Sequence, residues 1–156
     1  MSAFIRKASV GDETSIRSLV RQAGLNPLGL HWRNFIVAED AGGIVACGQL
    51  RPHRRGSAEL ASLVVSPARR GAGIGSELVR TLIRRGPPQL YLMCEAKMRR
   101  YYAAFGFSVV AAGQLPSEMQ ALFRLGSIFA WTVRTLTCRP VRVLAMRRQS
   151  GQSPLE

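Results

Sequence analysis

The feature that most constrains the fold is a glycine-rich turn between an apolar run and an amphipathic helix. The run AELASLVV (58–65) ends at Ser66-Pro67, and Arg70-Gly71-Ala72-Gly73-Ile74-Gly75 then opens a segment whose apolar residues recur at helical spacing until Gly86. Glycine lets a backbone approach a phosphate closely, and the amides of a helix N-terminus favour negative charge. The turn therefore predicts an anion-binding helix start.

Two common phosphate-binding patterns do not fit this turn. It lacks the Lys-Ser/Thr ending of a nucleoside-triphosphate loop, and it lacks a Rossmann setting because the strands before it read as a meander. Arg69 and Arg70 add cationic side chains at its mouth.

The other segments predict an α/β (α+β) fold: a mixed, mostly antiparallel twisted sheet of six to seven strands, flanked by helices. Ser9 and Asp12 form a capping box before a helix whose apolar positions include Ile16 and Val20, and Gly24 ends it. We predict strands at 4–8, 34–39, 44–50, 58–65, 89–94 and 141–146, and a further strand that begins in the turn at 106–110. Further helices are predicted at 97–105 and 117–137.

The chain has 156 residues, 47% hydrophobic and 20% charged, which suits one domain. We assign this domain to 1–146, with a core motif at 58–107 and a C-terminal helix and strand at 117–146, and we expect a flexible tail at 147–156. No apolar stretch is long enough for a membrane span. Three cysteines without CxxC spacing argue against a disulfide framework and a zinc site, so we expect no metal and a cytoplasmic location.

The formal net charge is +13, and all basic residues except Lys7 and Lys97 are arginines. The positive side chains are spread along the chain without interleaved aromatics, so we expect no nucleic acid as partner. The imbalance still favours an anionic ligand or surface and disfavours a polycationic substrate.

The segment LASLVVSPARRGAGIGSELVRTLI resembles the central motif of the GNAT superfamily of acetyl-CoA-dependent N-acetyltransferases. That motif is a hydrophobic strand, a proline at Pro67, and Arg/Gln-x-x-Gly-x-Gly/Ala, filled here by Arg70, Gly73 and Gly75.

A second element supports the same resemblance. YYAAFGF resembles the family's Tyr-x-x-x-Gly-Phe element, with Tyr102, Gly106 and Phe107 in its places, and the strand order predicted from residue 4 to about 110 also matches. NPLGLHWRNFIVAED and CGQLRP are similar to GNAT proteins of cyanobacterial and plastid type.

The resemblance implies acetyl-CoA as co-substrate. In the family, the coenzyme A pyrophosphate lies on the amides of the turn, and the preceding strand splays from its neighbour and pairs with the pantetheine arm. An amide of that strand also donates to the thioester oxygen. The matching cofactor-binding residues here are Leu63, Val64, Val65, Arg69, Arg70, Gly71, Ala72, Gly73, Ile74, Gly75, Ser76 and Tyr101.

Acetyl transfer to an amine needs a base for the ammonium proton and an acid for the leaving thiolate. The resemblance implies Tyr102 as the acid, with Tyr101 as its rival because a one-residue shift in helix phase exchanges them. Glu59 is the leading base, acting directly or through a water. Strand alternation puts Glu59 on the same face as Leu63 and Val65 unless a bulge intervenes.

Two further side chains compete for roles near the reaction. His53 has a suitable native pKa, but it lies in a basic loop with three arginines, where we expect it to be neutral and exposed. Cys94 ends a strand near the expected thioester, and we interpret it as a small buried hydrophobe.

The most favoured function is transfer of the acetyl group of acetyl-CoA to a primary amine by direct attack in a ternary complex. A non-catalytic acyl-CoA sensor of the same fold and an arginine-rich nucleic-acid-binding protein are the alternatives. The acceptor stays open, either a small amine or a protein or peptide, because the loops 24–34 and 111–120 do not specify it. For the helix at 117–137 three roles stay open: packing on the sheet, a homodimer interface, or contact with a membrane surface.

Overall fold

The computed structural model describes residues 3–124 and 142–149, which fall into two compact units. The first unit comprises 3–51 and 60–86, and the second comprises 52–59, 87–124 and 142–149. Strand β4 (Ala58–Val65) contributes residues to both units. The assignment of 1–146 to one domain stays a prediction.

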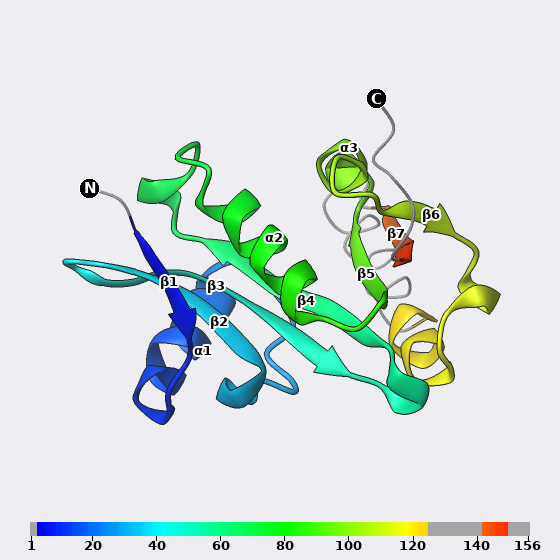
Figure 1. Cartoon of the computed structure of the whole chain (residues 1–156), viewed down its shortest axis with the longest axis horizontal. Helices are drawn as coiled ribbons and strands as arrows, with labels where there is room; N and C mark the ends of the chain where they lie inside the picture. The colour runs from blue at the N-terminus through cyan, green and yellow to red at the C-terminus, as the bar shows by residue number, and fades with distance from the viewer. Residues whose placement is uncertain (1–2, 125–141, 150–156) are drawn as a thin grey trace, which may run out of the picture. The chain divides into compact units, whose positions relative to one another are not determined.

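Seven strands of the described chain form a sheet in the order β1-β2-β3-β4-β5-β7-β6, and Figure 1 labels each of them. Besides β4, their bounds are β1 Phe4–Lys7, β2 Phe35–Asp40, β3 Gly43–Pro52, β5 Gln89–Glu95, β6 Ser108–Val110 and β7 Val143–Gln149. The pairs β1–β2, β2–β3, β5–β7 and β6–β7 are antiparallel, and β4–β5 is parallel. The mixed, mostly antiparallel sheet is therefore confirmed.

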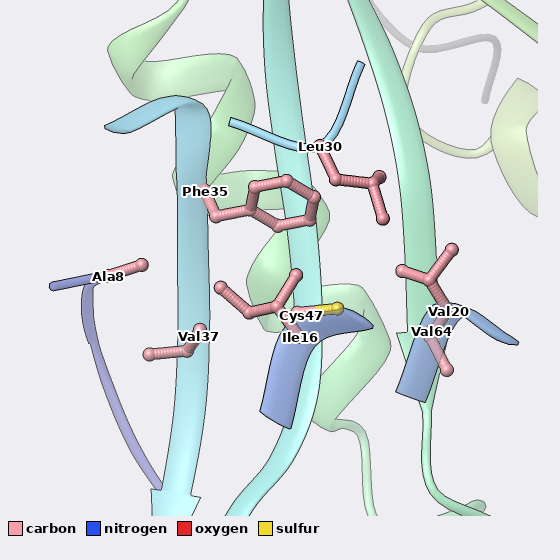
Figure 2. Packing of buried hydrophobic residues seen from close by; sticks show 8 residues of the cluster. All are labelled: Ala8, Ile16, Val20, Leu30, Phe35, Val37, Cys47 and Val64. Atoms are coloured by element: carbon pink, nitrogen blue, oxygen red, sulfur yellow. The ribbon is translucent and has the colours of Figure 1, made fainter. Parts of the chain in front are cut away.

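Helices α1 (Glu13–Gln22) and α2 (Ile74–Arg85) cover opposite faces of the first unit's strands. Cys47 and Gly48 are consecutive in β3, so they point to opposite faces. Cys47 packs in a core cluster with residues of α1, whereas a methyl group added at Gly48 would lie 3.0 Å from Leu82 Cδ1 of α2. Figure 2 shows the cluster on the α1 side, which contains Ala8, Ile16, Val20, Leu30, Phe35, Val37, Cys47 and Val64.

An ion pair between Arg6 and Asp12 fixes the entry to α1. Arg6 Nη1 lies 2.7 Å from Asp12 Oδ2, and the same oxygen accepts bonds from the backbone N–H and the hydroxyl of Ser9. The capping arrangement predicted for Ser9 and Asp12 is therefore confirmed. The hydrogen bond from Arg6 is the largest cause that holds the pKa of the buried Asp12 carboxyl well below its ordinary value.

Strand β4 contains one residue in the left-handed backbone region. Ser62 has a φ of +52°, which is uncommon and strained for a residue with a side chain. Such a residue interrupts the regular alternation of a strand. The shared face predicted for Glu59, Leu63 and Val65 stays a prediction.

In the second unit, β5 leads through a 3-10 turn (Ala96–Met98) into helix α3 (Arg99–Ala103), where a helix at 97–105 was expected. β7 lies between β5 and β6 and pairs with both. The core cluster of this unit is formed by Tyr91, Leu115, Met119 and Ala145. The parallel β4–β5 ladder comprises Ala58 with Leu90 and Glu59 with Tyr91, and the splay expected beyond it stays a prediction.

The C-terminal strand differs from the expectation at both ends. We expect a strand at 141–146 followed by a flexible tail, but β7 runs Val143–Gln149. Arg147 pairs with both Tyr91 and Ser108 in the ladders, and Arg148 Nε donates to the Phe105 carbonyl at 2.9 Å. These polar residues belong to the strand mainly through backbone pairing. The spacing of apolar residues in the sequence does not predict such pairing. The helix expected at 117–137 is described over 117–124, and its remainder lies outside the described residues.

Candidate active site

The glycine-rich turn joins β4 to α2 within the first unit. Gly71 and Gly73 have φ angles of +82° and +78°, which residues with a side chain rarely adopt. A methyl group added at either glycine would meet no heavy atom within 4 Å beyond its chain neighbours. The N–H of Glu77 donates to the Gly73 carbonyl at 3.1 Å, so the N–H groups of 74–76, in the first turn, have no carbonyl partner inside the helix.

This geometry fits an anionic group. Unpaired N–H groups at a helix start carry partial positive charge, and open backbone at two glycines leaves room for close approach. The diphosphate of coenzyme A, which the family resemblance assigns to Arg70 through Ser76, is compatible with both features.

The two arginines beside the turn already contact the protein. Arg69 forms an ion pair with Asp40, whose side chain is buried, and Arg70 Nε donates to the Val65 carbonyl at 3.2 Å. Asp40 therefore offsets part of the charge that Arg69 would offer to a phosphate. Arg70 links the turn to the end of β4.

The strand residues before the turn face alternate sides. Val64 is buried in the core cluster on the α1 side, whereas Leu63 Cδ1 lies 3.2 Å from a methyl group placed on Gly48, on the α2 side. The Val64 side chain is thus committed to the core. Val64 can therefore make its predicted contact with the cofactor only through its backbone.

Polar contacts from β3 support the irregular position in β4. Gln49 Nε2 donates to Ser62 Oγ at 3.0 Å, and Cys47 Sγ lies 3.9 Å from the Ser62 carbonyl oxygen. Neither Gln49 nor Ser62 was predicted from the sequence to act near the site. The one available signal is a glutamine inside the otherwise apolar run IVACGQL, which turns out to be completely buried.

Glu59 is buried at the start of β4, in the second unit. Its side chain is 4% exposed, and its Oε2 lies 3.5 Å from Nε2 of His53, whose side chain is also 4% exposed. The expectation that His53 is exposed is therefore wrong. The N–H of His53 donates to the Ser57 carbonyl at 2.9 Å and closes the loop, while the neighbouring Arg54 side chain is 93% exposed. A run of charged residues in a sequence does not indicate which side chain of a tight loop is buried.

Tyr101 and Tyr102 are adjacent on α3 but differ in burial. Tyr102 is buried and Tyr101 is half-buried, and their rings meet edge to face with centroids 5.0 Å apart. Burial, with smaller contributions from Tyr101 and Cys94, raises the pKa of Tyr102 well above that of a free phenol. The Tyr102 phenol is therefore protonated at neutral pH and can donate a hydrogen bond, although the raised pKa makes it a weaker acid than a free phenol.

The thiol of Cys94 is not activated. Burial, followed by the charge of Glu95, raises the pKa of Cys94 to about 11, and its Sγ lies 3.7 Å from Met146 Sδ. A thiol of this kind is a poor nucleophile at neutral pH. This environment agrees with a packing role for Cys94.

The predicted site residues fall into two groups. The turn, Arg69, Arg70 and 63–65 belong to the first unit, whereas Glu59, Tyr101 and Tyr102 belong to the second. Within 3–124 and 142–149, no group of three or more His, Cys, Asp or Glu side chains could hold a metal ion. In the same part of the chain, no helix is both long and apolar enough to cross a membrane.

Comparison with protein families gives a match to the acetyltransferase (GNAT) domain over residues 31–109, just over half of the chain. The chain belongs to the GNAT acetyltransferase family. The matched range contains β4, the glycine-rich turn, and the element from Tyr102 to Phe107. The family resemblance inferred from those motifs is therefore confirmed.

Known GNAT relatives agree with this assignment. Mycothiol acetyltransferase of Rhodococcus jostii is 31% identical over 130 residues, covering 83% of this chain and 37% of the relative. N-acetylglutamate synthase from Neisseria gonorrhoeae, solved with coenzyme A and N-acetyl-glutamate, superposes with a TM-score of 0.76 at 22% identity, covering 96% of this chain and 35% of that one. The chain thus spans little more than a third of these proteins.

A relative of similar length shares the GNAT fold. The Mycobacterium tuberculosis protein Rv2747, solved in complex with CoA, superposes with a TM-score of 0.71 at 21% identity, covering 94% of this chain and 98% of the other. These relatives come from Rhodococcus, Neisseria and Mycobacterium, and they do not support the cyanobacterial or plastid-type subgroup.

Proposed function

We propose that this GNAT chain transfers the acetyl group of acetyl-CoA to a primary amine by direct attack in a ternary complex. The observation that carries the proposal is the open backbone at Gly71 and Gly73 before the unpaired N–H groups of α2. The structures of GNAT relatives solved with coenzyme A support the same cofactor. The names of the Rhodococcus and Neisseria proteins support an acetyl-transferring activity.

The chain's own contribution to binding is electrostatic and lies at the turn. The amides from Arg70 to Ser76 bind the diphosphate, and the Arg70 side chain holds that turn against the end of β4. When bound, acetyl-CoA supplies the thioester whose acetyl group is transferred. A backbone amide within 63–65 donates to the thioester oxygen as negative charge develops on it, an interaction worth about 3 kcal/mol per donor in comparable sites.

Glu59 is the proposed base. An amine acceptor is protonated near neutral pH and must lose a proton before it attacks. Glu59 is 3% exposed, and a carboxylate held away from water is a stronger hydrogen-bond acceptor than a solvated one. It takes the ammonium proton either directly or through a water.

Tyr102 is the proposed acid. This phenol is protonated at neutral pH, so it donates a hydrogen bond to the departing thiolate, and its raised pKa makes it a weaker proton donor than a free phenol. The half-buried Tyr101 is proposed to contact the cofactor. Tyr101 also packs edge to face on Phe105, with centroids 5.3 Å apart, which supports the short helix.

The acceptor is proposed to be a small primary amine or a peptide amine. The test is an assay with a panel of acceptors that contains amino acids, polyamines, aminoglycosides and peptides. Release of free thiol from acetyl-CoA is monitored by absorbance. Thiol release that depends on one acceptor and on Glu59 supports the transferase. Tight acetyl-CoA binding without turnover on any acceptor would instead identify a sensor of the same fold.

A further inference from the structure

The proposed base is paired with a histidine that no catalytic step above uses. His53 Nε2 lies 3.5 Å from Glu59 Oε2, at the outer limit of a hydrogen bond, and both side chains are 4% exposed. His53 Nε2 has no hydrogen-bond partner among the described residues. A buried imidazole nitrogen without a partner costs free energy, so this position calls for a role beyond packing.

A buried base needs an exit for its proton. Glu59 takes a proton at every turnover and must return to the carboxylate before the next one, yet its side chain has almost no contact with solvent. Imidazole is the side chain best suited to pass a proton on near neutral pH. An ion-pair contact places the ionisable His53 side chain beside Glu59.

A second carboxylate in the same unit is influenced by the charge of His53. Glu118, on the helical segment 117–124, has a side chain that is 35% exposed and lies 3.9 Å from Arg54 Nε. Hydrogen bonding by its own backbone N–H is the main cause that lowers the pKa of Glu118, and hydrogen bonding by Ser117 and the charge of His53 act in the same direction. His53 therefore lies within electrostatic range of both Glu59 and Glu118.

We propose that His53 is a proton relay that connects the buried Glu59 to the surface carboxylate Glu118. This inference rests on the proposed function. The acceptor N–H bond breaks as an O–H bond forms on Glu59, and that proton then moves from Oε2 to Nε2 of His53. The imidazolium releases its Nδ1 proton to Glu118 or to water, and exchange of the remaining proton from Nε2 to Nδ1 restores the neutral tautomer that can accept from Glu59 again.

The charged and titratable surroundings of His53 are consistent with a transient imidazolium. Glu59 lies on β4 and Glu118 on the segment 117–124, while Arg54 extends into solvent from the same loop as His53. Tyr91 of β5 is the ladder partner of Glu59, and its hydroxyl accepts a bond from Gln89 Nε2 at 2.8 Å. Of these groups, Glu59 is in contact with His53, and water screens the charge of the exposed Arg54.

The relay is tested first without any activity measurement. The chain contains two histidines, so His31→Gln assigns the imidazole NMR signals of the full-length protein unambiguously. We expect the titration midpoint of the His53 ring to fall by about 0.5 pH unit or more in Glu59→Gln, because a nearby negative charge is lost. Glu118→Gln should lower it as well. The His31 midpoint serves as the internal control and should not move in either variant.

An unchanged His53 midpoint in Glu59→Gln would overturn the relay whether or not the protein is a transferase. A lower His53 midpoint in Glu59→Gln together with an unchanged His53 midpoint in Glu118→Gln would overturn the proposed transfer from His53 to Glu118. Because Glu118 is partly exposed, its variant keeps the test decisive even if a substitution at a buried position prevents folding.

The second test uses turnover. We expect His53→Gln to lower kcat about tenfold, to leave KM for acetyl-CoA unchanged, and to be partly restored by high concentrations of a small buffer base. A kcat and pH profile equal to those of the wild type would overturn the relay. Full activity in Glu59→Gln would instead overturn the proposed base, so the two failures are distinguishable.

Discussion

The side-chain amide of Gln49 donates a hydrogen bond to the Ser62 hydroxyl over 3.0 Å, at the point where β4 adopts a left-handed backbone. Gln49 is completely buried, and its Oε1 has no hydrogen-bond partner within the described part of the chain. An apolar residue would avoid that desolvation cost. We infer that the glutamine stabilises the irregular strand segment immediately before Leu63.

Substitution of Ser62 tests this relationship. Ser62→Val should lower the free energy of unfolding by about 2 kcal/mol, because a β-branched residue is strained at this φ and cannot accept the bond from Gln49. Ser62→Gly loses the bond but relieves the strain, so its change should stay within about 1 kcal/mol. Urea unfolding measures both. Equal stability of the valine variant and the wild type would rule out the strained conformation.

Substitution in the turn tests anion binding. Gly73→Ala should weaken acetyl-CoA binding about tenfold or more, because alanine disfavours the φ of +78° that opens the backbone toward the ligand. The change is measured as a smaller rise of Tm at saturating acetyl-CoA.

Gly113 provides the matched control for that variant. It lies outside the turn, does not have a positive φ, and would place an added methyl group in open space. Gly113→Ala should therefore keep the full rise of Tm. An unchanged ligand response in Gly73→Ala would argue against the turn as the anion site.

Removal of one hydroxyl tests the proposed acid. Tyr102→Phe should lower kcat about 100-fold while acetyl-CoA still raises Tm, because the ring packing stays and only the proton donor is lost. Tyr101→Phe is the comparison at the adjacent position. A larger loss of kcat in Tyr101→Phe than in Tyr102→Phe would reverse the assignment.

The Arg6–Asp12 pair predicts a pH dependence of stability. The folded protein lowers the Asp12 pKa, so the pair stabilises the fold above the unfolded-state pKa of about 3.9 and loses this contribution as the pH falls below it. Asp12→Asn should lower the free energy of unfolding by about 2 kcal/mol at neutral pH. Between neutral and acidic pH, the variant should lose less of its free energy of unfolding than the wild type does. Parallel stability curves for the two proteins would contradict the ion pair.

The strands and helices of the first unit could be predicted because burial there follows regular periods. Ile16 and Val20 recur at helical spacing, and both are buried against the sheet. The turn was recognisable because its glycines are needed for backbone conformations that other residues disfavour. Gly71 and Gly73 both have positive φ angles, as that reasoning requires.

The contacts that tune the site could not be predicted, since they join residues distant in sequence. Nothing in the sequence near Arg69 indicates that Asp40 neutralises part of the Arg69 charge. The basic residues around His53 suggested that its side chain is exposed, but the structure shows that it is buried. The distortion at Ser62 depends on Gln49 from the neighbouring strand. Each of these depends on side-chain direction in the folded chain, which composition and spacing do not encode.

Calorimetric titration of the full-length protein with acetyl-CoA tests most directly whether the turn before α2 binds a diphosphate. We expect saturable binding that is weakened by Gly73→Ala and retained in Gly113→Ala. Coenzyme A should compete with acetyl-CoA, whereas pantetheine, which lacks the diphosphate, should not. Absence of binding at millimolar acetyl-CoA, or equal competition by pantetheine, would contradict it.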